Sequence, residues 1–190
     1  MRTFISDIFG KTPELEKLAE SLSDDIEIID PYAGEFIPFA NESEAYDYFK
    51  ENVGIDRYCE VVRNRLEQSP CSMLIGFSVG ATVIWLLSAD PSLKHPVKAA
   101  CFYGSQIRHY PDIEPGISIE LILPCYEPDF SVFGLAQKLS EKPNVTIHIT
   151  AFRHGFMNPR SQNYHHAGFQ QCVQWLKAGA GTDFREFSPV

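Results

Sequence analysis

The stretch LIGFSVGATVIW, residues 74–85, decides the fold. It leads from an apolar segment into Gly76, places Ser78 between two glycines, and continues from Gly80 into a segment that is apolar on nearly every side. This pattern is typical of a buried strand that bends sharply into a helix, where glycines let neighbouring backbones approach closely. The start of the helix also directs N–H groups to the bend, where they favour a developing negative charge. The stretch therefore predicts a nucleophilic Ser78, and a helix-capping role for this serine is the alternative.

The sequence on either side of this stretch predicts alternating strands and helices. Short apolar, β-branched runs predict strands at 3–6, 26–30, 71–76, 97–104, 117–124 and 145–150. Helical spacing of apolar residues predicts helices from Pro13, over 42–67 with a break at Gly54, and over 81–89, 131–141 and 162–177. Thr12 is the expected cap of the first helix, and Asn41 with Glu44 resembles a capping box at the start of the second. Such alternation is typical of an α/β fold, here a six-stranded, mostly parallel sheet with helices on both faces. We expect one domain over residues 1–190, because a single core can reach that size.

Composition and charge narrow the class of protein. Of the 190 residues, 44% are hydrophobic and 22% are charged, which is ordinary for a globular chain. The formal net charge is −9, and Lys and Arg form no cluster along the chain, so we expect no nucleic-acid partner. The first eleven residues are too short and too polar for a signal peptide or a membrane span. We therefore predict a cytoplasmic protein without a membrane partner.

The cysteines and clustered histidines do not suggest a metal or a disulfide framework. The five cysteines are an odd number and show no CxxC spacing, so we expect buried, reduced thiols. His165 and His166 are adjacent in a predicted helix and would point in different directions, which favours an ordinary helix surface. We predict no metal site and no cofactor.

A serine nucleophile needs a base that takes its proton and an acid that orients the base. In hydrolases with a GxSxG turn the chain order is Ser, then Asp or Glu, then His, each after a strand. His154 stands directly after the strand predicted at 145–150 and before Gly155, so it is the candidate base. The preceding strand is followed by Glu127 and Asp129. We prefer Asp129 as the acid, with Glu127 as the substitute and a solvated loop carboxylate as the alternative.

Acyl transfer also needs backbone N–H groups that stabilise the oxyanion. One candidate donor is Val79, directly after the nucleophile. The other is Ile8, in the loop after the first predicted strand. Asp7, its neighbour, either is an active-site carboxylate that positions Ser78 or only forms the turn at the end of the strand.

Taken together these motifs resemble the dienelactone hydrolase family, a branch of the α/β-hydrolases. The resemblance is carried by DIFG (7–10), IDPY (29–32), GFSVGA (76–81), FYG (102–104), EPDFSV (127–132) and HGFMNP (154–159). It implies an α/β-hydrolase fold with Ser78 as nucleophile, His154 as base, Asp129 as acid, and Ile8 and Val79 as oxyanion donors. It also places Asp7 where the family has a glutamate that helps to set up the nucleophile.

The chain departs from this family in three respects. Ser78 stands where the dienelactone hydrolases proper have a cysteine. Asn158 stands where the family has a basic residue that grips the substrate carboxylate. The family also has a pair of strands ahead of the one that leads to the oxyanion loop, whereas this chain starts almost at that later strand. The strand at 26–30 is therefore expected at a sheet edge, with charge from Asp24, Asp25 and Asp30 to protect it, and homodimerisation is left open.

From these features we predict a hydrolase that cleaves a small-molecule ester or thioester through an acyl-enzyme. An acyltransferase with the same triad, or a non-catalytic binding or regulatory protein on this fold, is the alternative.

Overall fold

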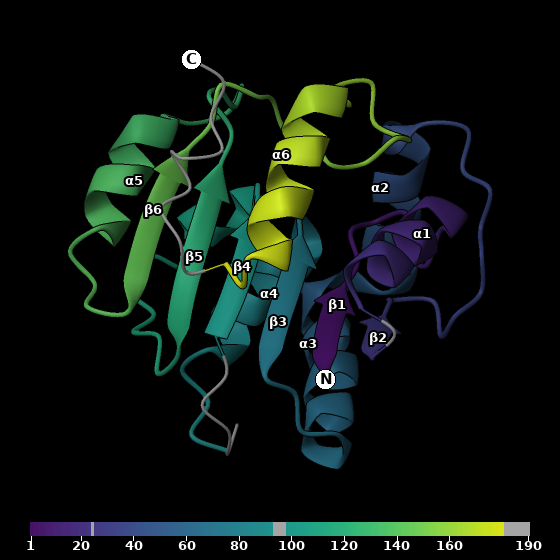
Figure 1. The fold of residues 1–190 in the computed structure, drawn as a ribbon, viewed down its shortest axis with the longest axis horizontal. Helices are drawn as coiled ribbons and strands as arrows, with labels where there is room; N and C mark the ends of the chain where they lie inside the picture. The colour runs from purple at the N-terminus through teal and green to yellow at the C-terminus, as the bar shows by residue number, and fades with distance from the viewer. Residues whose placement is uncertain (24, 93–97, 181–190) are drawn as a thin grey trace.

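The strands form one parallel sheet. A computed structural model describes residues 1–23, 25–92 and 98–180. Within them six strands pair in parallel in the order β2-β1-β3-β4-β5-β6 (Figure 1). Their bounds are β1 Arg2–Ile5, β2 Ile26–Ile29, β3 Met73–Phe77, β4 Lys98–Phe102, β5 Ser118–Leu123 and β6 Val145–Ile149. The predicted α/β architecture is confirmed, and every described strand pair is parallel.

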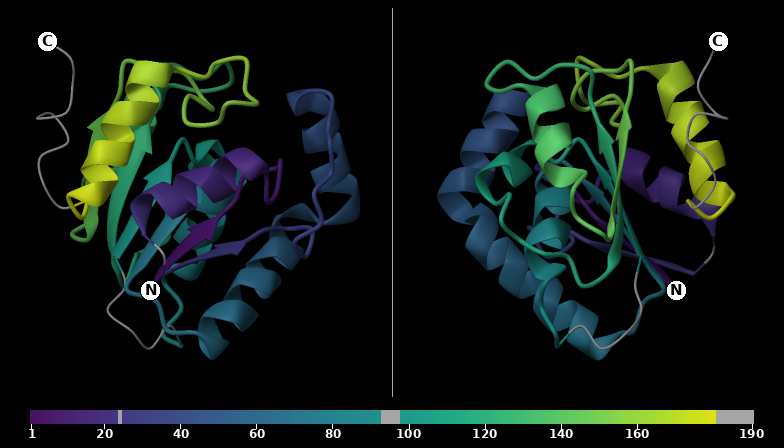
Figure 2. Two further views of the ribbon diagram at one scale, coloured as in Figure 1. Left: turned by 45° about the vertical axis from the view of Figure 1, so that its right-hand side comes forward. Right: turned by 90° about the vertical axis from the view of Figure 1, so that its left-hand side faces the viewer.

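Helices cover both faces of this sheet (Figure 2). They are α1 Pro13–Leu22, α2 Glu42–Asn52, α3 Gly54–Gln68, α4 Val79–Leu87, α5 Val132–Leu139 and α6 His166–Lys177, with a 3-10 turn, η1, at Ser105–His109. Successive residues of a strand point to opposite faces. In β1, for example, Phe4 packs in the core beneath α1 and α6, whereas Ile5 packs in the core beneath α2 to α5. Each strand therefore contributes to two cores, as expected for a covered parallel sheet.

The helix starts follow the capping residues in the sequence. Thr12 accepts a hydrogen bond from the Leu15 N–H at 3.1 Å and Pro13 opens α1. Asn41 accepts from the Glu44 N–H at 3.0 Å and so caps α2. These caps satisfy N–H groups that the helices themselves leave without a partner, and both were predicted.

The region over 42–67 agrees with the prediction, whereas the last helix differs from it. The region over 42–67 is divided into α2 and α3 at Gly54, whose φ of 71° favours glycine, so the expected break is confirmed. The last helix begins at His166, later than predicted, because the His165 ring caps it by accepting from the Gly168 N–H at 3.1 Å. His165 is therefore a capping residue and not part of the helix surface.

The edge strands are β2 and β6. The position of β2 was predicted, but its protection differs in part from the expectation. Asp25 pairs with the N-terminal amine at 3.1 Å, and Glu27 pairs with Arg65 of α3. Asp30 is buried and accepts backbone N–H groups of the following turn, so it does not add charge to the edge. Asp24 lies outside the described residues.

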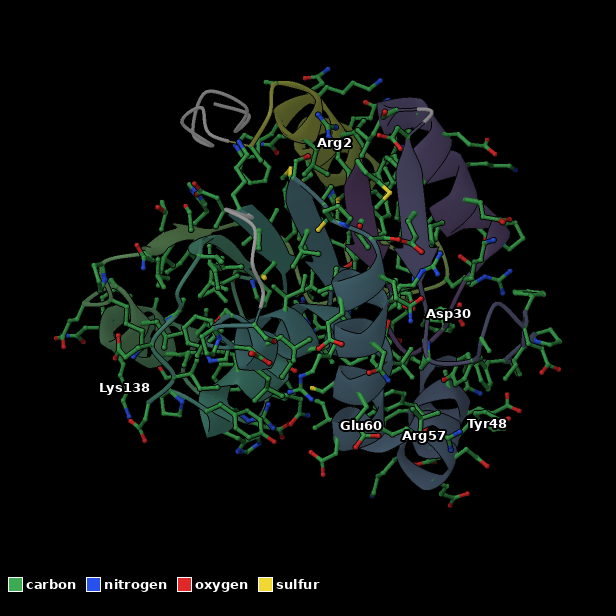
Figure 3. The ribbon with its side chains drawn as sticks, turned by 90° about the horizontal axis from the view of Figure 1, so that it is seen from below. Arg2, Asp30, Tyr48, Arg57, Glu60 and Lys138 are labelled. Carbon is green, nitrogen blue, oxygen red and sulfur yellow. The ribbon has the colours of Figure 1, made fainter. Side chains whose placement is uncertain are left out.

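The outside of α3 carries charged residues, among them Arg57 and Glu60 (Figure 3). No described helix is long and apolar enough to span a membrane. The five cysteines are free thiols; Cys125 is exposed and Cys59 is partly exposed, so these two depart from the expected burial. Among the described residues no three His, Cys, Asp or Glu side chains are grouped as metal ligands.

Candidate active site

Ser78 occupies the sharp turn between β3 and α4, at the carboxyl edge of the sheet. Its φ and ψ are 51° and −112°, a conformation that non-glycine residues rarely adopt. Both flanking glycines are sterically required. A Cβ on Gly76 would lie 2.6 Å from the Ile84 side chain, and one on Gly80 would collide with the backbone of Ile5 and Ser6. The sequence GFSVG therefore forms the strained turn that exposes the Ser78 hydroxyl.

Two backbone N–H groups lie beside this hydroxyl without an acceptor. In the described residues neither the Ile8 nor the Val79 N–H donates to a protein group, and both residues line the same pocket as Ser78. Val79 is the first residue of α4, where the helix supplies no acceptor. The Asp7 carbonyl accepts from the Gly10 N–H at 3.1 Å, and in a trans peptide the Ile8 N–H then points the opposite way. The structure thus brings the two predicted oxyanion donors to the nucleophile.

The loop that carries Ile8 is anchored by a tyrosine that sequence reasoning did not identify. The Tyr32 hydroxyl donates to the Ile8 carbonyl at 2.7 Å. Asp30 in turn fixes Tyr32, because its carboxylate accepts the backbone N–H groups of Tyr32 at 2.8 Å and Gly34 at 2.9 Å. The IDPY motif therefore holds the shape of the loop after β1.

His154 lies between Ser78 and a carboxylate. The distance from Ser78 Oγ to His154 Nε2 is 3.0 Å, and from His154 Nδ1 to Glu127 Oε1 it is 2.7 Å. Because a carboxylate only accepts hydrogen bonds, it favours the tautomer with the proton on Nδ1, which leaves Nε2 free to accept from the serine. The imidazole also packs against the Tyr103 ring, with 5.0 Å between ring centres. These contacts fix the orientation of the ring.

The carboxylate on His154 is Glu127, whereas the sequence prediction preferred Asp129. Two backbone hydrogen bonds continue the pairing of β5 and β6 beyond the strand ends: Thr150 N–H to Leu123 O at 2.9 Å, and Cys125 N–H to Phe152 O at 2.8 Å. The two loops therefore leave the sheet side by side, and the first acidic residue after β5 is the one next to the imidazole. Pro128 disfavours a helical backbone at Glu127. Glu127 is 8% exposed, while Asp129, two residues further on, faces solvent.

Asp7 is hydrogen-bonded to Asn158 and forms no hydrogen bond with Ser78. Its carboxylate accepts from the Phe9 N–H at 3.0 Å and from Asn158 Nδ2 at 2.7 Å. Burial raises the Asp7 pKa from 3.8 to about 6; the two hydrogen bonds lower it only in part, and Glu42 raises it further. Asp7 is thus a turn former that also joins the loop after β1 to the loop that carries His154. Asn158 stands where the dienelactone hydrolases have a basic residue. Its side-chain amide N–H donates to the Asp7 carboxylate.

The hydroxyl of Ser78 opens into a pocket of about 250 Å³. Four of its lining residues are Ser78, Val79, Ile8 and His154. The other lining residues are Glu42, Ser43, Tyr46, Ser105 and Gln106. The first three of these come from α2, and no local pattern predicts this contribution because α2 is far from the nucleophile in the chain. The pocket admits a small molecule to the serine and the two N–H groups.

Comparison with solved structures gives the class of fold. A protein from Klebsiella pneumoniae assigned as a dienelactone hydrolase superposes with a TM-score of 0.69 over 93% of this chain and 84% of its own, at 14% identity. A dienelactone hydrolase from Anabaena variabilis has a TM-score of 0.58 over 93% and 85%, at 18% identity. A cold-adapted esterase from an Arctic intertidal metagenomic library has 0.58 over 93% and 82%, at 16% identity. The chain therefore has the α/β-hydrolase fold, as the sequence resemblance implied.

Sequence comparison gives the family. No model of a known protein family matches the chain. The chain is 34% identical to the uncharacterized protein YczH of Bacillus subtilis over 151 residues, which cover 77% of this chain and 73% of YczH. The chain belongs to the same family as YczH.

Proposed function

We propose that this protein is a serine hydrolase that cleaves an ester or thioester of a small molecule through an acyl-enzyme on Ser78. The single observation that carries the proposal is the hydrogen-bonded series from Ser78 through His154 to Glu127, at 3.0 and 2.7 Å. Such a series is recognised by geometry and roles, whichever carboxylate ends it. The names of the neighbouring structures, dienelactone hydrolase and esterase, support the same class of reaction.

In the first half-reaction Ser78 Oγ attacks the substrate carbonyl carbon while His154 Nε2 takes the hydroxyl proton. The tetrahedral oxyanion is held by the N–H groups of Ile8 and Val79. The intermediate collapses, the bond to the leaving alcohol or thiol breaks, and His154 returns the proton to the leaving group. Glu127 orients the imidazole and stabilises its charged form. An acyl group now esterifies Ser78.

In the second half-reaction water replaces the leaving group. His154 takes a proton from a water molecule, and the resulting oxygen nucleophile attacks the acyl carbonyl in the same oxyanion site. Collapse releases the acid and returns the proton to Ser78 Oγ.

A fluorophosphonate probe tests the nucleophile. We expect stoichiometric labelling of the wild-type protein, none of Ser78→Ala, and full labelling of the matched control Ser43→Ala, because Ser43 lines the same pocket without contacting His154. Wild type and Ser43→Ala should turn over a p-nitrophenyl ester at similar rates, and Ser78→Ala should not turn it over. A folded wild type that resists the probe and releases no p-nitrophenol would overturn the proposal.

A further inference from the structure

The pocket next to Ser78 carries a negative charge that the proposed reaction does not use. Of the described residues that line the pocket, Glu42 is the only one with a carboxylate, and none is Lys or Arg. In the described part of the chain the Glu42 carboxylate forms no hydrogen bond or ion pair. Its neighbour Glu44, by contrast, turns back to the Ala40 N–H at 2.6 Å. Glu42 is therefore available to a bound molecule.

An aromatic ring accompanies this carboxylate. Tyr46 follows Glu42 by four residues in α2, so the two side chains lie on the same face of the helix. Both line the pocket, and Tyr46 is 42% exposed. A carboxylate beside an aromatic face attracts organic cations, because charge attraction and cation–π attraction then act on the same group.

The basic residues of the neighbouring loops do not offset this charge inside the pocket. The guanidinium of Arg108 lies 5.0 Å from the Phe130 ring centre, and that of Arg153 lies 5.7 Å from the Tyr126 ring centre. Arg160 is paired with a carboxylate of α1 at 3.0 Å. None of the three lines the pocket. A carboxylate-bearing substrate would therefore meet repulsion and no partner.

We propose that Glu42 is a specificity-determining residue that selects esters or thioesters with a cationic, ammonium-type group and disfavours anionic ones. The inference rests on the proposed function. A pocket with a basic residue prefers anionic substrates. Because of Glu42, this pocket would instead prefer cationic ones. Tyr46 contributes the aromatic surface against which the cation packs.

Three thioesters of one shape test the charge preference: acetylthiocholine, its uncharged isostere with a tert-butyl group in place of the trimethylammonium, and a carboxylate analogue. We expect kcat/KM of the wild type to fall in that order. Glu42→Gln should lower the value for acetylthiocholine about five- to tenfold and leave the uncharged thioester unchanged, the scale of one partly exposed charge pair with a cation–π contact. Asp47→Asn removes an equal charge from the same helix outside the pocket and should change neither value.

A second measurement separates this inference from the proposed reaction. Binding of intact acetylthiocholine to Ser78→Ala, measured by calorimetry, should be tighter than binding of the isostere and should lose that advantage in Ser78→Ala/Glu42→Gln. Turnover without a cation preference, or a preference that survives Glu42→Gln, overturns the inference and leaves the hydrolase intact. A Glu42-dependent binding preference without turnover supports the inference and refutes the proposed reaction. Equal binding of all three thioesters refutes the role of Glu42.

Discussion

Replacement of Asp7 by Asn should change how the stability of the protein depends on pH. Burial raises the Asp7 pKa from 3.8 to about 6. Below pH ~4 Asp7 is protonated in both states and has no electrostatic cost. Between pH ~4 and pH ~6 the unfolded chain has released this proton while the folded protein still holds it, so the free energy of unfolding falls as the pH rises. Above pH ~6 Asp7 is ionised in both the folded and the unfolded state, and it lowers the free energy of unfolding no further. A shift of about two units corresponds to about 3 kcal/mol, and since solvent reaches part of the side chain we expect about 1 to 3 kcal/mol.

Asn does not titrate, so the free energy of unfolding of Asp7→Asn does not fall with pH at this position. Urea unfolding of both proteins at pH 4 and pH 7.5, extrapolated to water, gives their difference in unfolding free energy at each pH. We expect the difference to shift in favour of Asp7→Asn by about 1 to 3 kcal/mol between the two pH values. The altered hydrogen bond to Asn158 shifts both measurements equally and so cancels. A difference that stays constant, or moves in favour of the wild type, would refute a raised Asp7 pKa.

Three further predictions concern the site. Glu127→Gln should lower kcat by about two to four orders of magnitude, because the amide no longer stabilises the charged imidazole. The control Asp129→Asn should retain nearly full activity. The reverse result would return the acid role to Asp129. Gly80→Ala should destabilise the protein by at least about 2 kcal/mol in urea unfolding, because the added Cβ collides with backbone, and unchanged stability would mean that the turn relaxes without cost. Tyr32→Phe removes the hydrogen bond to the Ile8 carbonyl and should lower kcat several-fold with little change in KM; an effect on KM alone would place Tyr32 in substrate binding.

The strands, the helix caps and the nucleophile turn could be predicted because their signals are local. Gly76 and Gly80 are needed within the turn itself, and Thr12 and Asn41 cap helices that begin at the next residue. Each signal lies within a few residues of the structure that it specifies. Local chemistry and tertiary structure therefore agree at these positions.

The features that the sequence did not reveal depend on tertiary contacts. The choice between Glu127 and Asp129 depends on how far β5 and β6 stay paired beyond their ends, which no local pattern reports. Tyr32 reaches Ile8 across 24 residues of chain. Glu42 reaches the pocket only because α2 folds over the carboxyl edge of the sheet. Such contacts become visible only once the elements are placed together.

The acyl-enzyme itself is the most direct test of the account. Wild-type protein mixed with p-nitrophenyl acetate and quenched within the first turnovers should gain the mass of one acetyl group, and peptide mapping should place that group on Ser78. Ser78→Ala should gain none. An acetyl group found on the exposed thiol of Cys125, or one that persists in Ser78→Ala, would contradict a serine nucleophile at this turn.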